Sequence, residues 1–189
     1  MIQMKIVIGM SGAAGALYAM RLLEELSEQA SVSLVVSETA KQIITDETEI
    51  EFADLEDMAE ESFDNHDMGA SICSGSRNFD AMVIVPCSMA TLAKVACGIS
   101  DNVITRAASV AMKERRKLII VPRETPLSSI HLENMLKLSR DGVIILPAMP
   151  GFYGGPESAM DMVDFIVGRI MDQLDIENNI GPRWGQKIE

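Results

Sequence analysis

Arg123 and Glu124 directly follow an apolar segment that ends at Pro122. Residues 118–121 are continuously apolar and rich in β-branched side chains, which is typical of a parallel strand covered by helices on both faces. Ligands of open α/β sheets bind outside the carboxyl ends of such strands. We therefore expect both charges to face a ligand, although an Arg–Glu dipeptide most often forms an ion pair at the surface.

Glycines recur at every third position in the first loop, at Gly9, Gly12 and Gly15. They lie between an expected strand at 5–9 and an expected helix at 16–26. Small residues let a phosphate or a ring approach the backbone, and the free N–H groups and dipole of a helix start favour negative charge. The loop therefore predicts an anion site. Its spacing is not the dinucleotide-binding G-x-G-x-x-G, and it would equally suit a close helix–strand contact.

Hydroxyl groups follow two further apolar segments. Ser88 and Thr91 come after residues 81–85, at the start of an expected helix, and Ser37 follows residues 32–36. Such hydroxyls can bind a phosphate or a ribityl chain, whereas a serine at a helix start is also an ordinary N-cap. Because the carboxyl ends of parallel strands share one edge of a sheet, these segments together predict a nucleotide-like ligand.

Apolar segments of strand length alternate with helical patterns along the chain. The expected strands are residues 5–9, 32–36, 81–85, 118–121 and 143–146, and the expected helices include residues 16–26, 107–112, 130–138 and 159–174. This order predicts an α/β fold: a doubly wound, mostly parallel sheet with helices on both faces, flavodoxin-like or Rossmann-like. We expect residues 1–189 to form a single domain, with the acidic residues 46–67 as a solvated helix or loop face.

The composition argues against several classes of partner and site. The formal net charge of -12 would repel nucleic acids and anionic membranes. No apolar run reaches membrane-spanning length, and the first residues lack a signal-peptide pattern. Cys73, Cys87 and Cys97 show no CxxC spacing, so we expect buried free thiols in a reducing compartment and a cytoplasmic protein. His66 and His131 give no metal-site spacing, and no metal is expected.

Further motifs occur in a fixed order along the chain. They are SGS at 74–76, PCSMAT at 86–91, TRAASVAMKERR at 105–116, PRETPLSSIHLENM at 122–135, LPAMPGFY at 146–153 and PRWG at 182–185. With the glycine loop, Ser37 and the charges after Pro122, they resemble the UbiX-type flavin prenyltransferases over nearly the whole chain. Each motif alone could arise by chance, but all of them in order identify the family.

The resemblance implies a cofactor-making transferase. Members of the family attach a dimethylallyl group from a phosphate donor, dimethylallyl phosphate, to reduced FMN, and the prenylated FMN is the cofactor of UbiD-type decarboxylases. The resemblance also implies a homo-oligomer, a dodecamer, with active sites at subunit interfaces, and a metal-independent reaction. The donor is either a monophosphate or a diphosphate.

The resemblance assigns roles by position. FMN-binding residues would be Gly12, Ala13, Ala14, Ser37, Ser88, Met89, Ala90, Thr91 and Arg123. Donor-binding residues would be Tyr153 and Arg169. Catalytic residues would be Glu47, Arg106, Lys113, Glu124 and Trp184.

The chemistry of the implied reaction suits these residue types. Cleavage of an allylic C–O bond leaves an allyl cation and a phosphate anion, so Lys113 and the arginines would stabilise the departing charge. Ring closure releases a proton, which Glu47, Glu124 or the departing phosphate would accept. The sequence contains neither DDxxD, the usual magnesium motif for allylic diphosphates, nor the P-loop GxxxxGK[ST].

One departure from the family pattern leaves two alternatives open. The family usually has a serine where this chain has Ala14, and the missing hydroxyl would affect catalysis more than flavin binding. A catalytically impaired FMN-binding protein is therefore one alternative. The other is a flavin-dependent cysteine decarboxylase, whose PASANT-like loop corresponds to PCSMAT with Ala90 in place of the asparagine, although no PxMNxxMW segment occurs.

Overall fold

Six parallel strands form one sheet in the computed structural model, which describes residues 3–185. The strands are β1 (Met4–Met10), β2 (Ala30–Val36), β3 (Glu61–Asp64), β4 (Ala81–Cys87), β5 (Lys117–Pro122) and β6 (Ile144–Ile145). Their order across the sheet is β3-β2-β1-β4-β5-β6, which reverses direction between β1 and β4. This is the doubly wound α/β sheet predicted above, and the reversal marks the point where such sheets bind ligands.

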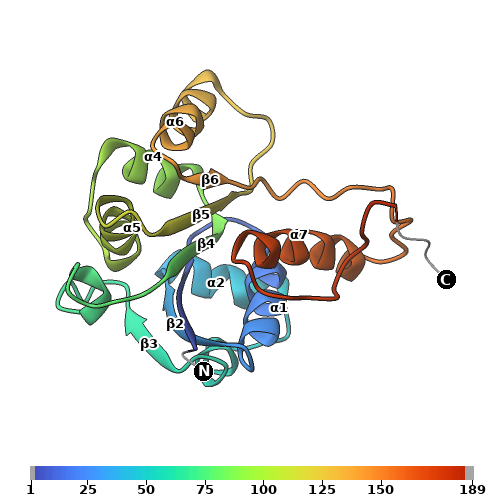
Figure 1. The fold of residues 1–189 in the computed structure, drawn as a ribbon, viewed down its shortest axis with the longest axis horizontal. Coiled ribbons are helices and arrows are strands. Elements are labelled where there is room, and N and C mark those ends of the chain that lie inside the picture. The colour runs from blue at the N-terminus through green and yellow to red at the C-terminus, as the bar shows by residue number, and fades with distance from the viewer. Residues whose placement is uncertain (1–2, 186–189) are drawn as a thin grey trace.

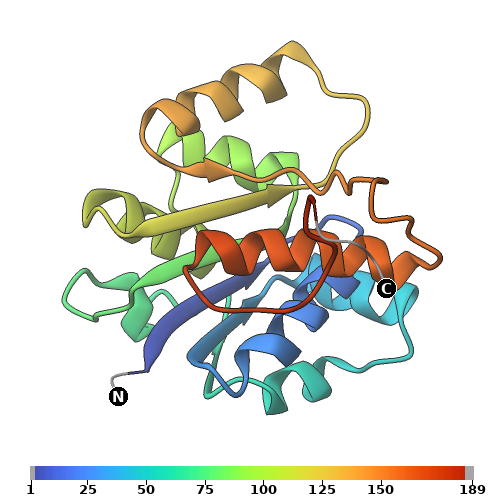
Figure 2. The ribbon, with the colours of Figure 1, turned by 45° about the vertical axis from the view of Figure 1, so that its right-hand side comes forward.

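Helices cover both faces of the sheet (Figure 1). They are α1 (Ala16–Leu26), α2 (Glu38–Glu47), α3 (Phe52–Asp57), α4 (Met89–Cys97), α5 (Val103–Lys113), α6 (Ser129–Arg140) and α7 (Ala159–Gln173), with a 3-10 turn, η1, at Ser71–Cys73. Helices α1, α2, α3 and α7 share one core cluster with the sheet, whereas η1, α4, α5 and α6 contribute to the other. Helix α7 lies alongside α1, and the chain then turns back along α7 (Figure 2).

Burial on both faces explains why the central strands are mostly apolar. Ile6 and Ile8 of β1 belong to the core on one face and Val7 to the core on the other, as alternation along a strand requires. Every residue of β4 is buried. A two-sided core gives continuous apolar runs, and those runs are the pattern that made β1, β2, β4 and β5 predictable.

The acidic stretch contains structure that the sequence pattern did not predict. We expected a solvated helix or loop face over 46–67, but β3 lies within it and pairs with β2 at the edge of the sheet. The strand has four residues, ESFD, and none of them is fully buried. Edge strands this short and polar have no apolar signature. Across residues 3–185, none of the helices has the length and apolar character that a membrane span requires.

Candidate active site

The ends of β1, β2, β4 and β5 meet at one edge of the sheet, here called the carboxyl rim. It comprises residues 11–15, Ser37, residues 88–91, Arg123 and Glu124. Three backbone hydrogen bonds join neighbouring strand ends: Ser37 N donates to Met10 O (3.0 Å), Ser11 N to Pro86 O (3.2 Å) and Arg123 N to Cys87 O (3.3 Å). The predicted FMN-binding residues therefore come together at the point where the strand order reverses.

Ser11 connects the two loops at this reversal, and the sequence reasoning missed it. Its side chain is only 2% exposed. Its Oγ accepts a hydrogen bond from Ser88 N (2.8 Å) and lies 3.3 Å from Pro86 O, to which it donates. A small polar residue directly after the first strand was the available signal, and the neighbouring glycines obscured it. Ser11 fixes the start of the PCSMAT loop relative to the glycine loop.

Removing the Ser11 hydroxyl should loosen both loops. Ser11→Ala leaves the Ser88 N–H without its acceptor, so we expect a loss of about 1–3 kcal/mol in the free energy of unfolding. FMN affinity should fall as well, because the Ser88 hydroxyl loses its fixed position. Urea unfolding and flavin titration measure both effects. Ser27→Ala, which removes an exposed hydroxyl bonded to Glu24 O, is the control; equal stability losses in the two variants would contradict the linking role.

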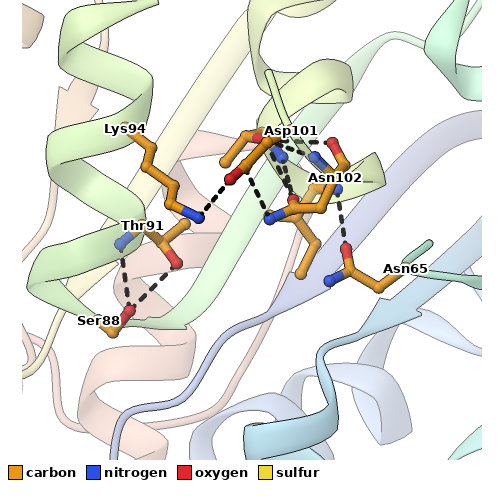
Figure 3. A network of polar contacts seen from close by, with 8 residues as sticks. Asn65, Ser88, Thr91, Lys94, Asp101 and Asn102 are labelled. Atoms are coloured by element: carbon orange, nitrogen blue, oxygen red, sulfur yellow. Dashed lines mark hydrogen bonds and ion pairs between the residues drawn. The ribbon is translucent and has the colours of Figure 1, made fainter. Parts of the chain in front are cut away.

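The Ser88 and Ser37 hydroxyls both cap helices. Ser88 Oγ accepts from Thr91 N (3.2 Å) and lies 3.1 Å from Thr91 Oγ1, as Figure 3 shows at the start of α4. Ser37 Oγ accepts from Ala40 N (3.2 Å) at the start of α2. The N-cap reading offered for Ser88 is therefore correct, and Ser37 caps its helix in the same way. The Ser37 hydroxyl accepts one N–H and can still donate its proton to a ligand, whereas the Ser88 hydroxyl already donates to Thr91 Oγ1, so a ligand that accepts from Ser88 would have to replace that bond.

Glu47 occupies the start of α1. Its Oε2 accepts hydrogen bonds from Gly15 N (2.8 Å) and Ala16 N (2.9 Å). Gly15 has a φ of 109°, a left-handed conformation that favours glycine and that turns these N–H groups toward the carboxylate. The helix start was expected to attract an anion, and the anion that it binds in this structure is the chain's own side chain.

The two roles of Glu47, helix cap and proton acceptor, can be separated by Glu47→Gln. The amide oxygen can still accept from both N–H groups, so we expect FMN affinity within about fivefold of the original, since a capping charge contributes ~0.3–1 kcal/mol. If the carboxylate accepts the proton released on ring closure, kcat falls about 100-fold. Steady-state kinetics with a separate flavin titration make the comparison, and an unchanged kcat would leave Glu47 only its capping role.

None of the ion pairs within residues 3–185 joins Arg123 to Glu124. Arg123 Nε donates to Ala14 O (3.1 Å), and Glu124 Oε1 accepts from Thr125 N (3.1 Å). Both side chains are exposed and line a small cavity of about 90 Å³ at the end of β5. Because Arg123 bonds the backbone of the glycine loop and not Glu124, the surface ion-pair reading is wrong. The charge of Arg123 also lies near Tyr18: burial raises the pKa of the Tyr18 phenol, and this charge opposes the rise.

Arg106 and Lys113 lie elsewhere, beside the SGS segment. Arg106 Nε donates to Cys73 O (3.0 Å), and a Cβ built on Gly75 would lie 2.6 Å from Lys113 Nζ. Lys113 precedes the first residue of β5 by four positions, whereas Arg123 follows its last residue. A six-residue strand is roughly 20 Å long. Within one chain, Lys113 is therefore far from the carboxyl rim, at the opposite end of the sheet. Arg106 lies nearer to the rim, because Ile104, two positions earlier on α5, lies 3.2 Å from a Cβ built on Gly9 near the end of β1.

Tyr153, Arg169 and Trp184 form a third group, here called the aromatic pocket. They line a cavity of about 160 Å³ together with Phe165 and Pro182. The Tyr153 ring meets the rings of Trp184 and Phe165 edge to face, with centroid separations of 5.1 and 5.7 Å. Its hydroxyl donates to Pro182 O (3.3 Å). A guanidinium beside aromatic faces suits a ligand with an anionic head and an apolar tail.

The cysteines do not supply a nucleophile at the rim. Burial raises the pKa of the Cys87 thiol to about 12, so the PCSMAT sulfur stays protonated. Cys73 is also buried, but Cys97 is exposed, so the expectation of three buried thiols was wrong for that residue. Among residues 3–185, no cluster of His, Cys, Asp or Glu side chains could hold a metal ion.

Comparison with known proteins identifies relatives over almost the full length. Residues 1–171 match the family described as Flavoprotein. The flavin prenyltransferase UbiX of Methanocaldococcus jannaschii is 49% identical over 182 residues, covering 96% of this chain and 99% of the relative. UbiX of Methanothermobacter thermautotrophicus is 52% identical over 183 residues, covering 96% of each protein.

Similar solved structures come from the same family as these relatives. AnUbiX (PadA1), in complex with FMN and dimethylallyl pyrophosphate, has a TM-score of 0.96 at 39% identity, covering 99% of this chain and 100% of that one. A dodecameric FMN-dependent UbiX-like decarboxylase from Escherichia coli O157:H7 has a TM-score of 0.95 at 45% identity, covering 97% and 100%. Peptidyl-cysteine decarboxylase EpiD, at 19% identity and a TM-score of 0.63, shares only the fold. The chain therefore belongs to the Flavoprotein family and, within it, to the UbiX flavin prenyltransferases.

Proposed function

We propose that this protein transfers a dimethylallyl group from dimethylallyl phosphate to reduced FMN, and that UbiD-type decarboxylases receive the prenylated FMN. The observation that carries the proposal is the carboxyl rim. There Arg123 holds the glycine loop beside the Ser37 and Ser88 hydroxyls, which cap α2 and α4. Relatives at 49% and 52% identity over nearly the whole chain have this activity in their names.

The chemistry of the rim fits FMN. The loop residues Gly12, Ala13 and Ala14 are small, and a Cβ at Gly12 would lie 2.6 Å from the Thr39 methyl carbon, so a larger residue would displace the loop. Hydroxyls and backbone N–H groups suit the ribityl chain, and the Arg123 guanidinium suits the phosphate. We propose Met89, Ala90 and Thr91, at the start of α4, as further contacts. Bound reduced FMN would supply the nucleophile.

The aromatic pocket fits the prenyl donor. Arg169 and Tyr153 would bind the phosphate, and the rings of Tyr153 and Trp184 would flank the dimethylallyl group. Aromatic faces stabilise nearby cations, so this wall would also stabilise the allyl cation that forms as the C–O bond breaks. The AnUbiX complex with dimethylallyl pyrophosphate supports a donor of this class.

We propose further that each active site is shared between chains of a homododecamer. Within one chain the carboxyl rim and Lys113 lie at opposite ends of β5, and the relative from Escherichia coli O157:H7 is dodecameric. Helix α6 exposes three large apolar side chains, which suits a subunit contact. They are Ile130 (65% exposed), Leu132 (52%) and Leu136 (50%). Arg106, Lys113 and Glu124 would then act on the donor phosphate and the released proton.

We also propose a single domain and a cytoplasmic location for the protein. Residues 1–189 would form one flavoprotein domain, since one sheet takes strands from β1 to β6 and α7 packs on α1. The three cysteines are free, which agrees with a reducing, cytoplasmic compartment.

Phosphate release tests the proposal. Under anaerobic conditions the purified protein should release inorganic phosphate from dimethylallyl phosphate only when reduced FMN is present. Oxidised FMN is the matched control, because it binds at the same rim but lacks the reduced ring needed for attack. Phosphate release without flavin, or none with reduced flavin, would contradict a prenyl transfer.

Decarboxylation is the second candidate function. The Escherichia coli O157:H7 structure is named an FMN-dependent UbiX-like decarboxylase, and a relative from Aquifex aeolicus, 38% identical, is named a phenylacrylic acid decarboxylase. A decarboxylase would release carbon dioxide from an acid substrate without any prenyl donor. Carbon dioxide measured with phenylacrylic acid, in the presence of FMN and the absence of donor, separates the two functions.

A further inference from the structure

One carboxylate, Asp172, joins two arginines at the edge of the aromatic pocket. Arg169 Nη1 donates to its Oδ2 (2.8 Å). Arg183 Nη1 reaches both oxygens, at 2.7 and 2.6 Å, and Asn178 Nδ2 donates to Oδ1 (3.1 Å). The Asp172 side chain is only 20% exposed, whereas that of Arg169 is 52% exposed. The less exposed partner therefore fixes the more exposed one.

The same carboxylate fixes the segment after α7. Arg183 lies between Pro182, whose carbonyl accepts from the Tyr153 hydroxyl, and Trp184, whose ring meets the Tyr153 ring. Gly168 allows the segment to approach the helix, because a Cβ there would lie 2.7 Å from Ile180 O. The contact between Arg183 and Asp172 thus sets where Trp184 sits on the pocket wall.

The charges at Asp172 also affect an anionic ligand. Burial works to raise the pKa of Asp172, but hydrogen bonds from Arg183 and Asn178 and the charges of Arg183 and Arg169 hold it below its ordinary value, so the carboxylate is ionised at neutral pH. With two arginines for one carboxylate, a net positive charge remains beside the pocket. Without Arg183, Asp172 would neutralise Arg169 and repel an incoming phosphate.

We propose that Asp172 and Arg183 are positioning residues of the donor subsite. Asp172 orients the Arg169 guanidinium and, through Arg183, the Trp184 ring, while Arg183 preserves the positive charge that attracts the donor phosphate. This inference rests on the proposed function, because it takes Arg169 and Tyr153 as the phosphate ligands.

Trp184 is the only tryptophan of the chain, so its fluorescence reports directly on this segment. In flavin-free protein, Arg183→Met should lower the Trp184 anisotropy and weaken binding of dimethylallyl phosphate, measured by the change in Trp184 emission, about 10- to 100-fold. FMN affinity should be unchanged. Asp164→Asn is the control: Asp164 lies on α7 like Asp172, but it pairs with Arg21 of α1 (2.7 Å), so its loss should leave Trp184 emission and donor binding unchanged.

The double variant separates charge from structure. In Asp172→Asn/Arg183→Met the charge that neutralises Arg169 is gone, while the amide oxygen can still accept the hydrogen bond from Arg169 that the carboxylate accepts at 2.8 Å, so donor affinity should recover part of the loss caused by Arg183→Met alone. If Arg183 only stabilised the segment, the double variant would bind donor no better than the single one, and the proposal would be overturned. Unchanged anisotropy in Arg183→Met would overturn it as well.

These outcomes remain distinct from failure of the proposed function. An unsubstituted protein that binds donor but makes no prenylated flavin would overturn prenyl transfer, while the Trp184 measurements would still decide the roles of Asp172 and Arg183. An unsubstituted protein whose Trp184 emission does not respond to the donor would overturn the donor subsite itself.

Discussion

Arg123→Gln should weaken FMN binding by about 100-fold, the largest effect expected from any single change at the carboxyl rim. Loss of a charge-assisted contact to phosphate costs roughly 2–4 kcal/mol, and each 1.4 kcal/mol is about tenfold in affinity. The same guanidinium also holds Ala14 O at 3.1 Å, so the variant loses the loop position together with the phosphate contact. Flavin titration followed by fluorescence quenching measures the dissociation constant.

The matched control for Arg123→Gln is Arg21→Gln. Arg21 is an arginine on α1 that pairs with Glu25 and Asp164 and has no contact with the carboxyl rim. It should leave FMN affinity unchanged. If both variants lose affinity equally, or if Arg123→Gln binds FMN normally, then Arg123 does not bind the flavin phosphate and the rim is not the flavin site.

Lys113→Met should lower kcat by about 100- to 1000-fold, because a group that stabilises the departing phosphate charge contributes that much to the rate. FMN binding should be unaffected, since Lys113 lies at the opposite end of β5 from Arg123. At an FMN concentration too low to fill the Arg123→Gln sites, both variants should have little activity, and they should complement each other. If each site takes Lys113 from one chain and Arg123 from another, a random mixture leaves about one quarter of the sites intact.

Co-expression of Lys113→Met with Arg123→Gln, each carrying a different affinity tag, tests this sharing. Tandem purification selects mixed assemblies, and their kcat per chain should approach one quarter of the original value. Mixing the two separately purified proteins without exchange of chains is the control and should restore nothing. Mixed assemblies as inactive as either parent would mean that both residues serve a site within one chain, or that Lys113 serves no site.

The sheet and its ligand-binding edge were predictable because each depends on local pattern. Strands β1, β4 and β5 are buried on both faces, and this burial gives continuous apolar runs. The residue types that follow these runs then mark the rim. Strand β3 escaped prediction because an edge strand of four residues needs no apolar run. Its position depends on pairing with β2, which is a tertiary contact.

The contacts that shape the site depend on residues far apart in sequence. Glu47 caps α1 from 31 residues away, and Ser11 bonds Ser88 across 77 residues. Neither pairing has a spacing that a sequence pattern could reveal. The network of Asp172 and Arg183 was missed for the same reason, because it requires the chain to turn back along α7.

The mass of the extracted flavin decides whether a chain that carries Ala14 transfers a prenyl group to FMN. We would incubate the protein anaerobically with reduced FMN and dimethylallyl phosphate, with Ala14→Ser as a parallel sample. We expect a flavin heavier by one prenyl unit from the unsubstituted protein and faster formation in Ala14→Ser, because the added hydroxyl can orient the flavin or move a proton. Unchanged FMN from both proteins, although each binds flavin and donor, would contradict prenyl transfer by this protein.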